Sequence, residues 1–195
     1  MVPKARGMVK IGHPVLRLRA RQVPRKAMGS PSLQVLVQEM IASMRRAKGV
    51  GLAANQIGVR SQIFVMECRG NVRYPKAKPF PLQAYLNPRI VRYSRGHESD
   101  WEGCLSIPGY RGLVPRAKSV TFEAVTPQGR KVKRTLTGFE ARVFQHETDH
   151  LNGRFYIGDF LLANRSLNEG VEERVRAERA GFEFGVELHA DEERV

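Results

Sequence analysis

The chain has 195 residues, of which 42% are hydrophobic, 33 are Lys or Arg, 19 are Asp or Glu and two are Cys. These values fit one globular domain and exclude a disulfide framework, and no segment approaches the roughly 18 consecutive apolar residues of a membrane-spanning helix. The first residues contain no apolar leader segment, so we expect a cytoplasmic protein with no membrane partner.

The charge is distributed unevenly along the chain. Residues 168–195 contain nine acidic and four basic residues, a net charge of −5, whereas residues 1–167 carry +19. A body this basic attracts polyanions, and the ribosome surface is the partner that we expect; the alternative is a basic surface that binds nothing. Nothing in the sequence indicates recognition of a specific DNA site.

The first clear element is a helix at 30–48. Ser30 can cap its N-terminus, and Pro31 fits the first turn. Apolar residues then follow at helical spacing and form one stripe: Leu33, Leu36, Val37, Met40, Ile41 and Met44. We expect Gly49 to end the helix as the residue after its C-cap. A loop rich in glycine and alanine should follow at 49–58.

Strands are predicted further along the chain. One is expected at 62–67 and a second at 84–93, where Pro88 indicates an edge strand or a bulge. Two alternating segments, 119–125 and 131–137, flank the sequence Thr-Pro-Gln-Gly, which is typical of a hairpin.

A second helix, at 138–153, is bracketed by glycines. A polar helix near 168–180 and a short strand within 182–188 are expected beyond it. Strands followed by a helix predict an α+β fold, with antiparallel or mixed sheets packed around a central metal-binding helix and a C-terminal tail of helix or helix plus strand. We place the catalytic domain at 1–165 and an acidic tail at 166–195.

The sequence His-Glu-Thr-Asp-His lies within this second helix. Residues His146 and His150 are four apart, so both imidazoles lie on one face, with the carboxylate of Glu147 beside them. This pattern is typical of a divalent metal site with an adjacent base. Phe139 and Val143 place the histidines on the buried stripe, which argues against the alternative of two surface histidines.

A metal site of this kind needs a third protein ligand. Cys104 stands out, in a turn between apolar residues, although a lone Cys is often a small buried hydrophobe. The remaining candidates are the carboxylates, Cys68 and the other histidines, His13, His97 and His189. The glycine-rich loop 49–56 lacks the Lys-Ser/Thr pair of a phosphate-binding loop; its small residues would let another backbone approach, and Gln56 offers an amide donor.

Taken in order, three segments resemble the peptide deformylase family. They are GVGLAANQ at 49–56, EGCLS at 102–106 and QHETDH at 145–150, and the similarity spans roughly residues 8–160. The resemblance implies hydrolysis of the N-formyl group from the initiator methionine of nascent peptides, which releases formate. It also implies that Cys104, His146 and His150 bind the metal, with water in the fourth position.

The resemblance further implies catalytic roles for Glu147 as general base and for the Gln56 amide and the Leu105 backbone N–H as oxyanion donors. The residues expected to bind substrate are Val50, Gly51, Gly103, Arg111, Phe139 and Val143. We also expect Arg116 and Asp149 to form an ion pair behind the metal helix.

Imidazole and thiolate ligands suit both Fe(II) and Zn(II), and we favour one Fe(II) per chain because the family generally works with it, with zinc as the alternative. Two other functions stay open: a zinc-dependent peptidase with the same histidine motif, and a basic RNA- or ribosome-binding module without chemistry.

Overall fold

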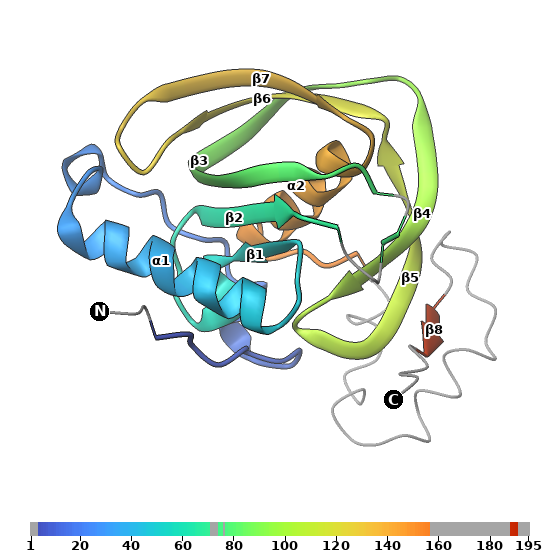
Figure 1. Cartoon of the computed structure of the whole chain (residues 1–195), viewed down its shortest axis with the longest axis horizontal. Helices are drawn as coiled ribbons and strands as arrows, with labels where there is room; N and C mark the ends of the chain where they lie inside the picture. Colours follow the sequence, from blue (N-terminus) through green and yellow to red (C-terminus); the bar gives the residue numbers. More distant parts are fainter. Residues whose placement is uncertain (1–3, 71–73, 76, 157–187, 191–195) are drawn as a thin grey trace.

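The computed structural model describes residues 4–70, 74–75, 77–156 and 188–190 (Figure 1). Two short 3-10 helices, η1 (Pro14–Arg17) and η2 (Arg25–Ala27), precede the first α-helix. Between them the Ala20 N–H donates to the Leu151 carbonyl over 2.8 Å, so the start of the domain meets the end of the helix α2 (Gly138–Leu151). None of the helices in the described ranges is long and apolar enough to cross a membrane.

Helix α1 (Pro31–Arg46) confirms the predicted first helix. The Ser30 hydroxyl accepts the Leu33 N–H over 3.3 Å, and the apolar stripe is largely buried. The predicted role of Gly49 is wrong by one residue, because Lys48 adopts the left-handed conformation (φ 53°) and Gly49 follows it, donating its N–H to the Met44 carbonyl.

One five-stranded antiparallel sheet has the order β1-β2-β3-β6-β7. Its strands are β1 (Gly51–Ala53), β2 (Ile63–Cys68), β3 (Phe80–Tyr93), β6 (Ser119–Val125) and β7 (Lys131–Thr137). The β6–β7 hairpin confirms the predicted turn. The expected loop at 49–58 instead contains β1 and a 3-10 helix, η3 (Ala54–Ile57).

Strand β3 shows why Pro88 is tolerated within a sheet. The strand is central rather than at an edge, so that part of the prediction is wrong, but the register shifts between Leu86 and Arg89 as in a bulge. Asn87, in the left-handed region at φ 49°, allows the bulge. Strand β3 also starts at Phe80, four residues before the predicted position.

A second sheet has the order β4-β5-β8 and contains β4 (His97–Cys104), β5 (Ile107–Ala117) and β8 (Leu188–Ala190). The β4–β5 hairpin has no counterpart in the sequence-based prediction. Strand β8 pairs with Tyr110–Gly112 of β5 and overlaps the alternating segment 182–188 only at Leu188. The predicted helix at 168–180, most of that segment and the proposed boundary at 165/166 lie outside the described residues.

Helix α2 (Gly138–Leu151) runs through the centre of the fold and contacts strands of both sheets (Figure 1). Its Phe144 packs edge-on against Phe64 and beside Phe122, in a buried aromatic cluster on the five-stranded sheet. The predicted fold class, α+β with antiparallel sheets around a central helix, is therefore confirmed.

Candidate metal centre and active site

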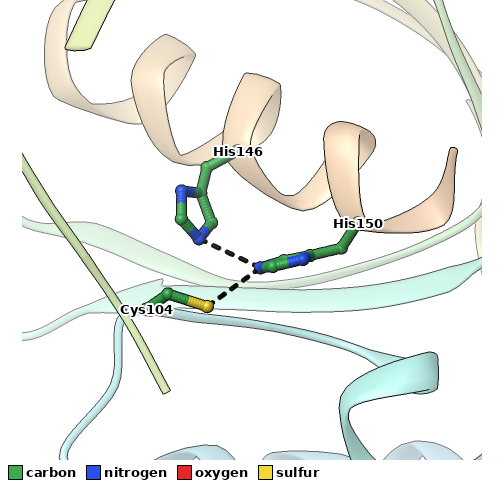
Figure 2. A group of neighbouring side chains, drawn as sticks. All are labelled: Cys104, His146 and His150. Atoms are coloured by element: carbon green, nitrogen blue, oxygen red, sulfur yellow. Dashed lines mark hydrogen bonds between the residues drawn. The ribbon is translucent and has the colours of Figure 1, made fainter. Parts of the chain in front are cut away.

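Two elements bring three metal-ligating side chains to one point. His146 and His150 lie one turn apart on α2, and Cys104 is the last residue of β4 (Figure 2). The two Nε2 atoms are 3.1 Å apart, and Cys104 Sγ is 3.3 Å from His150 Nε2; the potential ligand atoms all lie within 4.8 Å of one another. Ligand atoms of a tetrahedral site with bonds of about 2.0–2.3 Å are separated by roughly 3.4–3.7 Å, so this donor set fits a transition metal.

Two of the other histidines considered as third ligand, His13 and His97, do not reach this point. His13 caps η1 by accepting the Val15 N–H, and His97 lies at the start of β4; both are exposed. Among the described residues, Cys104 is the side chain that completes the cluster with the two helical histidines.

Glu102 orients the first histidine, a role that the sequence analysis missed. His146 Nδ1 donates to Glu102 Oε2 over 2.9 Å, which leaves Nε2 free to face the cluster. The carboxylate is 4% exposed and also accepts two hydrogen bonds from Arg116, at 2.9 and 3.0 Å. Burial alone would raise the pKa of Glu102, but hydrogen bonds from His146 and Arg116 outweigh it and lower the pKa to about 2.

Two arginines that bind this carboxylate, the buried Arg142 and the partly buried Arg116, tie α2 to the β4–β5 hairpin. Arg142, on α2, donates to Glu102 Oε1 over 2.8 Å and to the Val114 carbonyl of β5 over 2.7 Å. Arg116, on β5, reaches Asp149 of α2, so the predicted ion pair is present. These contacts hold the helix that carries both histidines against the hairpin that carries Cys104.

Glu147, the residue after His146 on α2, is buried. Its side chain is 3% exposed, and its Oε2 has no hydrogen-bond partner among the described residues. A Cβ on Gly51 would lie 2.2 Å from Glu147 Oε1, so only glycine leaves room for this carboxylate. Burial raises the pKa of Glu147 to about 7, with a partly opposing effect of His146, which suits a group that takes up and releases a proton near neutrality.

The Gln56 amide is oriented by its neighbours. Its Oε1 accepts the Ala53 N–H over 2.9 Å, and its Nε2 lies 3.2 Å from Ser106 Oγ and 3.5 Å from Cys104 Sγ. The amide NH2 group is thereby directed toward the cysteine. Leu105 follows Cys104 in the turn between β4 and β5.

A single cleft beside the cluster is lined by every residue expected to bind substrate: Val50, Gly51, Gly103, Arg111, Phe139 and Val143. Gln56, Cys104, Leu105, His146 and Glu147 line it as well, whereas His150 is not part of its wall. Sequence and structure therefore select one concave site.

The cleft also contains Tyr74, which the sequence analysis did not select. Its hydroxyl accepts the Gly103 N–H over 3.2 Å, and its ring centroid lies 4.8 Å from that of Phe139. The Arg111 guanidinium lies 4.9 Å from the centre of the same ring. The sequence offered one signal by which Tyr74 could have been selected: it is an aromatic residue in a segment that is otherwise rich in proline and basic residues.

Comparisons with known proteins point to one family. The family model described as polypeptide deformylase matches residues 5–164. Peptide deformylase 2 of Pseudomonas putida is 44% identical over 158 residues, which are 80% of this chain and 89% of that protein. A structure of the class I type b peptide deformylase from Acinetobacter baumannii with Met-Ala-Ser bound matches with a TM-score of 0.78 and 36% identity, over 80% of this chain and 98% of that one. The peptide deformylase of Thermotoga maritima matches with a TM-score of 0.70 and 35% identity, over 78% of this chain and 95% of that one.

Proposed function

Because the chain belongs to the polypeptide deformylase family, an enzyme family that hydrolyses the formyl group from the N-terminal N-formylmethionine of new polypeptides, we propose that Cys104, His146 and His150 hold the metal ion for this reaction. The observation that carries the assignment is the convergence of one thiol and two imidazoles beside the buried carboxylate of Glu147. A divalent ion held there would act as a Lewis acid and lower the pKa of a water molecule at its open position.

The positions of the protein groups support the following roles. Glu147 accepts a proton from the attacking water as the water oxygen bonds to the formyl carbon, and it then delivers that proton to the departing amine as the C–N bond breaks. The Gln56 amide and the Leu105 backbone N–H donate to the oxyanion that develops on the formyl oxygen. The products are formate and a peptide with a free N-terminus, so atoms and protons balance.

The cleft suits an extended peptide. Strands β1 and β4 are the terminal strands of the two sheets in the described residues, and Gly51 and Gly103 bring both of them to the cleft. A peptide backbone can lie between such edges without meeting side chains at these two positions. Val50, Phe139 and Val143 supply the apolar surface for the methionine side chain.

We propose Fe(II) as the bound metal, since a thiolate with two imidazoles suits iron as well as zinc and the related family generally uses iron. The test is anaerobic purification, metal analysis and a formate-release assay on formyl-Met-Ala-Ser with the protein loaded with Fe(II) or Zn(II). We expect rapid formate release by the iron form and none from the unformylated peptide. Cleavage of the internal peptide bonds without formate release would instead identify a zinc peptidase.

We also propose that the enzyme works in the cytoplasm and associates with the ribosome surface, where its substrate emerges. The support is the net charge of +19 on residues 1–167, which favours binding to ribosomal RNA at low salt. Ribosome co-sedimentation across a salt series tests this association, and a purified protein that never co-sediments at low salt would refute it.

A further inference from the structure

The segment Arg6–Ile11 crosses the two connections that hold the proposed oxyanion donors, η3 and the β4–β5 turn, named here the two donor loops. The Val9 N–H donates to the Gln56 carbonyl over 2.8 Å, and the Ile11 N–H donates to the Ser106 carbonyl over 2.9 Å. The Lys10 ammonium lies 3.3 Å from the Leu105 carbonyl. One short stretch of chain therefore contacts both loops, which belong to different parts of the fold.

These contacts close a ring around the donors. The Gln56 side chain reaches Ser106 Oγ over 3.2 Å, and the N–H groups of Val9 and Ile11 donate to the backbone carbonyls of the same two residues. Gln56 lies in η3 after β1, whereas Ser106 lies in the turn between β4 and β5. The segment thus links the edges of the two sheets at the point where the donors face the metal cluster.

The segment is itself anchored at both ends. The Arg6 N–H donates to Ser43 Oγ over 2.8 Å, and the Arg6 carbonyl accepts from Arg46 over 2.9 Å, so its start is fixed to α1. At its other end the Ile11 side chain packs against the buried group that contains Cys104. Because both ends of the segment are fixed, it can hold the two donor loops at a fixed distance from each other.

We propose that residues 6–11, the N-terminal strap, are a positioning element of the active site that sets the distance between Gln56 and Leu105. The proposal rests on the proposed function, which assigns these two residues as oxyanion donors. Such donors act only when aimed within a few tenths of an ångström, and a displacement of about 1 Å can cost about 100-fold in rate. Because the strap touches backbone rather than substrate, its loss should affect turnover and leave substrate affinity nearly unchanged.

The experiment removes the strap hydrogen bond to Ser106 in the metal-loaded full-length enzyme. Ile11→Pro deletes the N–H that reaches Ser106, and we expect kcat on formyl-Met-Ala-Ser to fall roughly 10–100-fold with little change in KM. Lys4→Pro is the matched control, because Lys4 is exposed and its N–H has no partner in the described part of the chain. If Ile11→Pro does not fold, Ile11→Ala keeps the N–H but weakens the anchor, and a smaller loss of kcat is expected.

A double-mutant cycle distinguishes a loss of donor positioning from a general disturbance of the fold. Gln56→Ala should lower kcat by itself, and once this donor is gone the strap substitution should cost much less than it does in the wild type. Additive losses in the cycle, or an unchanged kcat in both Ile11 variants, would overturn the strap proposal and leave the assignment of Gln56 intact. An unchanged kcat in Gln56→Ala would overturn both the donor assignment and the strap's role.

Discussion

Substitution Glu102→Gln tests the buried ion cluster that holds the metal centre together. The pKa of Glu102 is lowered from 4.5 to about 2, and this difference corresponds to about 3 kcal/mol of folding free energy at neutral pH. Breaking a buried ion pair typically costs about 3–5 kcal/mol; the lower end is expected here, because Arg116 keeps Asp149 and Arg142 keeps its carbonyl partners. For a chain of this size we expect the melting temperature to fall by roughly 6–12 °C.

The assay is thermal and urea unfolding of the metal-free protein between pH 7 and pH 2. Ionised Glu102 stabilises the fold above pH 4.5, and this contribution is lost as the pH falls from 4.5 toward 2, so wild type and variant should converge in acid. The matched control is Glu67→Gln, because Glu67 pairs with two arginines that are 42% and 69% exposed. This control substitution should lower the free energy of unfolding by about 1 kcal/mol or less. Equal costs for the two variants, or a Glu102 effect that does not depend on pH, would refute the reasoning.

Four further substitutions or deletions test the site and the charge distribution. Glu147→Gln should keep the metal and lose about 10²–10⁴-fold in rate; a metal-loaded variant with more than about a tenth of the wild-type rate would exclude Glu147 as base. Cys104→Ser should weaken metal binding in a competition titration, and unchanged metal content with unchanged turnover would make Cys104 a packing residue. Gly51→Ala should displace the Glu147 carboxylate and lower kcat, whereas Gly96→Ala, which meets only an ordinary contact, should not; similar kcat values for the two would contradict the close approach. Deletion of 168–195 should leave turnover on a short formyl-peptide nearly unchanged and strengthen ribosome co-sedimentation at low salt, because a charge of −5 is removed; weaker binding would identify the tail as a docking element.

The helical half of the candidate site could be predicted from local spacing. Residues four apart on a helix share a face whatever surrounds them, so the histidine motif required no tertiary information. Cys104 was different, because the residues around it did not distinguish a metal ligand from a small buried side chain. Only its likeness to a family motif selected it, and the structure then brought its thiol to 3.3 Å from His150.

The parts of the fold and of the site that the sequence did not predict depend on contacts between segments that are distant in the chain. Strand β4 reads His-Glu-Ser-Asp-Trp-Glu-Gly-Cys and is mostly exposed until its last residues, so it lacks the apolar alternation by which strands are identified. Arg142 looks like an ordinary charged helix residue until the fold surrounds its guanidinium with carbonyls and Glu102. Gly49 lies one position beyond Lys48, the left-handed residue that ends the helix, where a side chain would meet Leu105.

The hydrogen bond between Ala20 and Leu151 has a consequence for the order of folding. The domain closes through a loop of more than a hundred residues, a long-range contact that forms slowly compared with a hairpin. The sheet of β1, β2 and β3 exposes the apolar face around Phe64 until α2 arrives near the end of the domain. A chain cut before α2 therefore lacks both the cover of its core and the helix that carries the two histidines, so loss of solubility and loss of metal binding should appear together.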